Sequence, residues 1–128
     1  MDKLESQSTS NPSSISQATA LAALTGPQKV IGEMVTTYRE RRDMVVEMLN
    51  AAPGLACNKP HGAFYVFPSI SQGENDEAFV LDLLEQEGVA AVHGGAFLAP
   101  GHFRLSYAAD TELLREACRR IQRYCRKF

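Results

Sequence analysis

The chain has 128 residues, 45% of them hydrophobic and 22% charged, with a formal net charge of −2. This profile is typical of one globular domain and excludes collagen-like, coiled-coil and largely disordered chains. The slightly negative net charge does not favour a nucleic-acid partner. No apolar run reaches the ~18 residues of a membrane span. The polar first residues lack the apolar core of a signal peptide. Three cysteines suit a reducing compartment. We therefore expect a cytoplasmic protein, although its length is short for an enzyme that holds both cofactor and substrate.

The first half of the sequence predicts a loop followed by two helices. Residues 1–13 are polar and rich in Ser, and they include Asn11-Pro12; these residue types favour turns. Ser14 followed by Gln17 is a capping-box pattern, and apolar residues then recur at helical spacing. The pair Gly26-Pro27 can end this helix and open a longer one over 27–52, which has an apolar and a charged face.

The second half predicts short strands alternating with two helices. Asn75 or Asp76 can cap a helix that Gly88 ends, and Asp110 can cap the last helix. The strand candidates are short apolar runs, several of them bounded by Gly or Pro, over 55–57, 63–67, 89–92 and 103–107. The order α–α–β–β–α–β–β–α predicts an α/β (α+β) sandwich, with helices packed on a small sheet of about four strands.

Arg104 is the most informative residue for chemistry. Side chains alternate along a strand, so His102, Arg104 and Ser106 share one face, and Phe103 and its apolar neighbours share the other. A guanidinium can bind a carboxylate through two parallel hydrogen bonds. The residues alone leave two interpretations open: a carboxylate-binding arginine, or an arginine on the solvated face of an edge strand.

Other candidate sites have weaker patterns. Gly94-Gly95 could let a ligand approach the backbone, but it matches no nucleotide-binding fingerprint and is typical of a loop turn. The spacing of Cys57 and the three histidines His61, His93 and His102 matches no zinc motif, so we expect no metal site. Cys118 and Cys125 lie seven residues apart on one helix face and are expected to be core thiols.

The lysines are the candidates for a catalytic amine, and none has a suitable position. Lys3 lies in the polar start, Lys29 opens the long helix, Lys59 precedes a Pro turn and Lys127 is the penultimate residue. No lysine follows a buried strand, where desolvation would lower its pKa. We therefore assign no catalytic residue from the sequence.

Several segments together resemble one family. They are Ser6 to Gln17, Arg39-Glu40-Arg41-Arg42-Asp43, Gly62-Ala63-Phe64-Tyr65-Val66-Phe67-Pro68, Glu87-Gly88-Val89 and Phe103-Arg104-Leu105-Ser106-Tyr107-Ala108. In this order they resemble the C-terminal third of the class I, fold-type I pyridoxal-phosphate-dependent aminotransferases, and the bacterial aspartate aminotransferases most of all. The resemblance covers nearly the whole chain. It implies that 14–128 is the family's small domain with its connecting helix, and that residues 1–13 are an internal segment of a longer enzyme.

The resemblance implies two substrate-binding residues. Arg104 matches the arginine that binds the substrate α-carboxylate, and Phe64 matches an aromatic residue of the substrate pocket, although a core phenylalanine is an equal alternative. The whole enzyme would move an amino group between aspartate or a similar amino acid and a 2-oxo acid through pyridoxal phosphate, as a homodimer. The loop from His93 to Pro100 departs from the family pattern, so no site is assigned to it.

The family's cofactor-binding lysine and most of its phosphate contacts have no match in this sequence. The resemblance therefore implies a fragment, with pyridoxal phosphate bound only in the full-length enzyme and no activity in the isolated chain. The alternative is a stand-alone carboxylate-binding or protein-interaction module without catalysis. If the chain stands alone, an exposed apolar stripe on the long helix would promote self-association, whereas a monomer without exposed apolar surface would favour an evolved independent module.

Overall fold

The computed structural model describes residue 7 and residues 11–71 and 75–127. The chain divides into two compact units, Met1–Met34 and Val35–Phe128. In the first unit, helix α2 (Ser14–Thr25) buries none of its residues. Its N-cap is Ser13, whose side chain accepts the Ser16 N–H, so the expected cap at Ser14 is wrong by one residue.

The second unit contains the strands and the remaining helices. Helix α3 (Lys29–Asn50) enters it at Val35. Strand β5 (Phe103–Ser106) lies between β2 (Tyr65–Val66) and β4 (Val92–His93) in an antiparallel sheet, and β1 (Leu55–Ala56) pairs with β3 (Ser69–Ile70). A bridge between Ser69 and His102 connects the two sheets. The mixed α/β fold is therefore confirmed.

The strands are shorter than predicted, and one was missed. The 63–67 strand begins only at Tyr65, because Ala63 has a left-handed backbone (φ 61°). The 89–92 strand moves to Val92–His93, because Val89 still bonds the Leu83 carbonyl at the end of the preceding helix. Strand β3 was not predicted, because Pro68 is expected to end the 63–67 strand and only two residues after it pair with β1.

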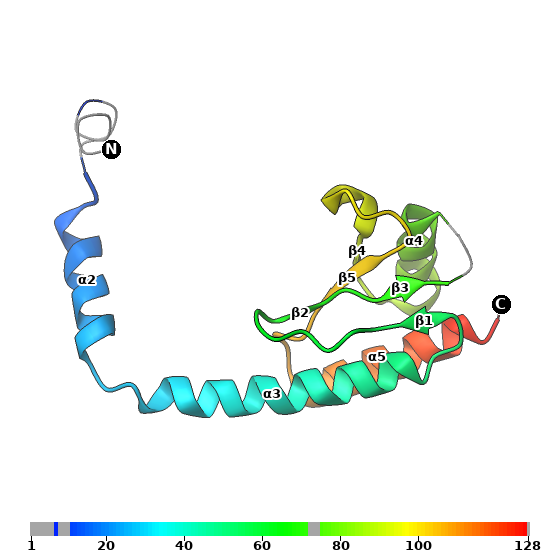
Figure 1. Ribbon diagram of the computed structural model, residues 1–128, viewed down its shortest axis with the longest axis horizontal. Coiled ribbons are helices and arrows are strands. Elements are labelled where there is room, and N and C mark those ends of the chain that lie inside the picture. The colour runs from blue at the N-terminus through cyan, green and yellow to red at the C-terminus, as the bar shows by residue number, and fades with distance from the viewer. Residues whose placement is uncertain (1–6, 8–10, 72–74, 128) are drawn as a thin grey trace. The chain divides into compact units, whose positions relative to one another are not determined.

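The core lies between the strands and the helices α3, α4 (Asp76–Glu87) and α5 (Thr111–Cys125). Figure 1 shows α5 beside the C-terminal part of α3, beneath the strands, and the Gln122 amide donates to the Met48 carbonyl across this contact (2.6 Å). Phe103 and Leu105 of β5 are buried in the core. The predicted caps are confirmed, because Asn75 and Asp110 each accept two backbone N–H groups.

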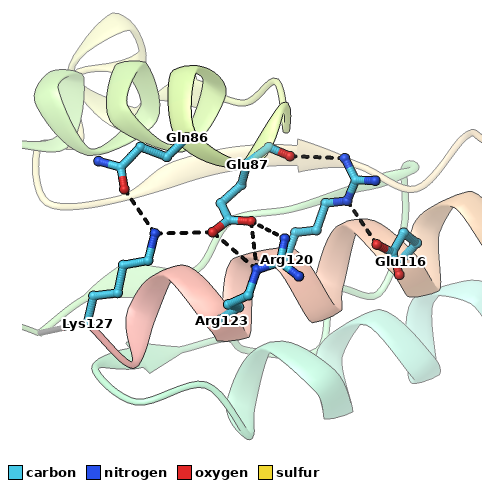
Figure 2. A network of polar contacts seen from close by, with 6 residues as sticks. All are labelled: Gln86, Glu87, Glu116, Arg120, Arg123 and Lys127. Carbon is cyan, nitrogen blue, oxygen red and sulfur yellow. Dashed lines mark hydrogen bonds and ion pairs between the residues drawn. The ribbon is translucent and has the colours of Figure 1, made fainter.

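A charged cluster joins the end of α4 to α5 (Figure 2). The buried Glu87 carboxylate accepts from Arg123, including a bond of 3.0 Å from Nε, and lies 3.3 Å from the Lys127 ammonium. Arg120 donates to the Glu87 backbone carbonyl and to the Glu116 carboxylate. Hydrogen bonds from Arg123 lower the pKa of Glu87 below its usual 4.5, against the opposing effect of burial.

Glu87→Gln is therefore expected to lower the unfolding midpoint of the chain by several degrees at pH 7. Because the pKa of Glu87 is lowered on folding, its contribution is complete above pH 4.5 and is lost as the pH falls through the folded value. Urea unfolding measured from pH 7 to pH 2 should show that the free energies of unfolding of the wild type and the variant converge below about pH 4. Glu85→Gln, a change at an exposed residue of the same helix, should have little effect on stability. Equal losses of stability in both variants would contradict the stabilising role of the Glu87 carboxylate.

Candidate functional site

Arg104 lies on the central strand of the three-stranded sheet, and not on an edge strand. Phe103 and Leu105 on either side of it are buried in the core, whereas Arg104 itself is half-buried. The predicted alternation of faces along 102–107 is therefore confirmed. The solvated-edge interpretation fails, because β2 and β4 flank β5 on both sides.

Two aromatic rings surround the Arg104 guanidinium. Its central carbon lies 4.4 Å from the ring centroid of Tyr65 on β2 and 4.4 Å from that of Phe97, which follows β4. Contacts at this distance are cation–π interactions, which provide no oxygen acceptor for the N–H donors of the guanidinium. The rings also restrict the rotamers of the side chain.

The N–H groups of Arg104 have no acceptor among the residues that the structure describes. Neither a hydrogen bond nor an ion pair joins the guanidinium to any of them. A half-buried arginine without a carboxylate partner is unusual, since burial of a charge is costly unless it is paired. The arrangement can therefore accept an external carboxylate through two parallel hydrogen bonds.

The loop after β4 forms a short 3-10 helix, η1 (Gly94–Phe97). Gly94 is buried, and a Cβ there would collide with the carbonyl oxygens of Ala99 and His102. The Gly95 N–H donates to the Asp76 carboxylate (2.7 Å). These contacts within the chain explain Gly94-Gly95 without a ligand, as the loop interpretation predicts.

Phe64 is exposed and does not belong to the core (41% exposed). Its ring lies 6.5 Å from that of Tyr38 and 4.4 Å from that of Tyr65. It lines a hollow of about 300 Å³ between α3 and the 61–64 turn; Arg39, Arg42 and His61 also line this hollow. Arg104 does not line it, but the ring of Tyr65 lies next to both predicted residues.

The other candidate nucleophiles that the structure describes are ion-paired or buried in the core. Lys29, Lys59 and Lys127 each form an ion pair with a carboxylate, and Lys3 lies outside the described residues. Cys118 and Cys125 are buried core thiols, as predicted, and burial raises the pKa of Cys118 to about 11. Within 11–71 and 75–127, no cluster of His, Cys, Asp and Glu could hold a metal ion, and no helix could span a membrane.

Sequence reasoning missed Tyr65 and Phe97 as the neighbours of Arg104. Tyr65 could have been found, because it faces outward on the strand that pairs with β5. Phe97 could not, because its ring position depends on how the loop folds back on β5. The aromatic cluster continues to Phe67, whose ring stacks on His102 at 5.2 Å and meets Phe97 at 6.1 Å.

Comparison with known proteins identifies the family. The model of the aminotransferase class I and II family matches residues 1–121. The chain is 49% identical over 136 aligned positions to an aspartate/prephenate aminotransferase of Cereibacter sphaeroides, covering 98% of this chain and 34% of that protein. It is 42% identical to an aspartate aminotransferase of Bacillus subtilis, covering 99% of this chain and 34% of that protein.

Solved structures give the same result. An aspartate aminotransferase from Rhizobium meliloti superposes with a TM-score of 0.89 at 42% identity, covering 96% of this chain and 34% of that one. An aromatic aminotransferase from Pyrococcus horikoshii also has a TM-score of 0.89, at 35% identity, covering 98% of this chain and 35% of that one. The chain thus spans about a third of the length of these relatives. It belongs to the class I and II aminotransferase family, whose members depend on pyridoxal phosphate.

Proposed function

We propose that this chain supplies the substrate-carboxylate site of an aminotransferase that acts on aspartate or a similar amino acid. The observation that supports this best is the half-buried Arg104 guanidinium, held between Tyr65 and Phe97 with no acceptor among the described residues. The similarity to aspartate and aspartate/prephenate aminotransferases supports the substrate class.

The chemistry of the reaction explains why such an arginine is useful. An amino acid and its 2-oxo acid product share the α-carboxylate, so one arginine serves both half-reactions. Two parallel hydrogen bonds fix the plane of the carboxylate and thereby the orientation of the neighbouring Cα, where the proton is removed. Arg104 is the residue to which we assign this binding.

We assign Phe64 to the wall of the substrate pocket. Its exposure and its contact with Tyr65, which itself stacks on Arg104, support this assignment. A flat apolar ring there would exclude water beside the bound carboxylate and strengthen its attraction to the guanidinium. In the whole enzyme, 14–128 would be the small domain with its connecting helix.

The lysines described here do not fit covalent attachment of pyridoxal phosphate. Such a lysine attacks as the neutral amine, which a desolvating environment favours, but Lys29, Lys59 and Lys127 are ion-paired, and their side chains are about half exposed or more. Pyridoxal phosphate supplies the electron sink in this family. We therefore place its attachment outside this chain and assign Arg104 to substrate binding alone.

The isolated chain is accordingly expected to have no transaminase activity. After incubation with pyridoxal phosphate and borohydride, peptide mapping should find no single lysine that is stoichiometrically modified. Joining the chain to the N-terminal two thirds of the Rhizobium meliloti enzyme should give an active transaminase. Turnover of aspartate by the isolated chain, or a specific modification of one of its lysines, would contradict the proposal.

A stand-alone binding module is the second candidate, and one observation bears on it. The first unit exposes apolar side chains on α2 and at the start of α3, namely Ile15, Leu21, Leu24, Val30, Ile31 and Met34. Exposed apolar side chains in such number favour a surface that packs against further protein. A monomer in sedimentation would favour the independent module, and self-association would favour the aminotransferase part.

A further inference from the structure

Asp76 lies at the start of α4, where it holds the loop that follows β4. Asp76 is buried (8% exposed), and its Oδ2 accepts the Gly95 N–H at 2.7 Å. The Nδ1 atom of His93 is farther away, at 3.8 Å. The bond from Gly95 lowers the pKa of Asp76, and the Gly101 N–H lowers it further. Asp76 is therefore ionised at neutral pH and is a strong acceptor for this loop.

A second contact fixes the same loop to β5. The buried Gly94 donates its N–H to the His102 carbonyl (2.7 Å), and its own carbonyl accepts from Ala99. There is no space for a Cβ at this point. Helix η1 is thus attached at Gly94 to His102, the residue before the strand that carries Arg104, and at Gly95 to Asp76.

The last residue of η1 contacts the guanidinium. Phe97 follows Gly95 by two residues, and its ring centroid lies 4.4 Å from the guanidinium carbon of Arg104. Tyr65, on the regular strand β2, needs no such support. The position of Phe97 depends on how η1 is held, so the contacts form a continuous path from Asp76 through Gly95 and Phe97 to Arg104.

We propose that Asp76 is a positioning residue, which holds η1 through Gly95 so that Phe97 keeps the Arg104 guanidinium oriented for a carboxylate. This inference rests on the proposed function of Arg104. Neither the sequence pattern nor the likeness to other aminotransferases assigns Asp76 any role beyond the end of a helix. The physical reason is preorganisation: an arginine already held in one rotamer loses less conformational entropy when it binds.

The test uses the 128-residue chain, NMR signals of the Arg104 side chain, and succinate as the carboxylate probe. The Phe97 ring should shift the Arg104 Nε–H resonance. Asp76→Ala should reduce this shift and weaken succinate binding about 2- to 10-fold. Asp76→Asn retains an acceptor oxygen and should remain near wild type. Glu77→Ala removes a neighbouring exposed carboxylate from the same helix turn and should change neither signal.

The outcomes separate the two proposals. Unchanged Arg104 signals in Asp76→Ala, or an Asp76→Asn variant as impaired as the alanine variant, would overturn the positioning role. Succinate binding that is unaffected by Arg104→Ala would instead overturn the proposed function. Phe97→Leu keeps the loop contacts of Gly95 and should still remove the ring-induced shift. If the Asp76→Ala variant does not fold, the Phe97→Leu variant still tests the inference. An Arg104 Nε–H shift that persists in Phe97→Leu would overturn it.

Discussion

Replacing Arg104 by alanine is expected to weaken succinate binding to this chain about 10- to 100-fold, the loss typical of hydrogen bonds to a charged group. The guanidinium is half-buried between Tyr65 and Phe97, and its N–H groups have no acceptor within the described residues. NMR titration at pH 7 measures the affinity. Arg104→Lys keeps the charge but loses the planar pair of donors, so it should lie between the wild type and the alanine variant.

A matched control separates binding from net charge. Arg119 lies on α5 with an exposed side chain near Glu116, so Arg119→Ala removes the same charge from another helix. It should leave the succinate affinity within a factor of about two, because surface charges act weakly at physiological salt. Equal losses of succinate affinity in the Arg104 and Arg119 variants would mean that binding depends on overall charge, and the carboxylate site at Arg104 would be wrong.

Phe103→Ala is expected to have the largest effect on stability, about 3–5 kcal/mol. Phe103 is completely buried next to Arg104, and its ring lies 5.2 Å from that of Phe79 on α4. Its removal leaves a cavity between the sheet and α4 that the short strands cannot close. Since a domain of this size has about 5–15 kcal/mol of stability, the variant would lose a large fraction of it.

Urea unfolding followed by circular dichroism measures this loss. Leu98→Ala is the control, because Leu98 is also a large apolar residue but follows η1 in a loop and is 95% exposed. The control should change the free energy of unfolding by less than about 0.5 kcal/mol. A Phe103→Ala variant as stable as the control would contradict the packing of Phe103 in the core between the sheet and α4.

The sequence by itself determined the features that depend on neighbouring residues. The caps at Asn75 and Asp110 follow from side chains that reach backbone N–H groups two and three residues away. The alternation along β5 follows from the strand repeat, so Arg104 was correctly predicted to face away from Phe103. The family also followed from the sequence, because an ordered set of short segments is specific even when no single one is.

Only the tertiary structure decided how Arg104 is surrounded. Its neighbours Tyr65 and Phe97 come from segments on either side of β5. Asp76 meets Gly95 across 19 residues of sequence. The ends of the short strands also could not be predicted from residue preferences. The left-handed backbone at Ala63 and the hydrogen bond of Val89 at the end of the preceding helix determine where β2 and β4 begin. Such contacts join residues far apart in the chain, so they form only when the core between sheet and helices brings the segments together.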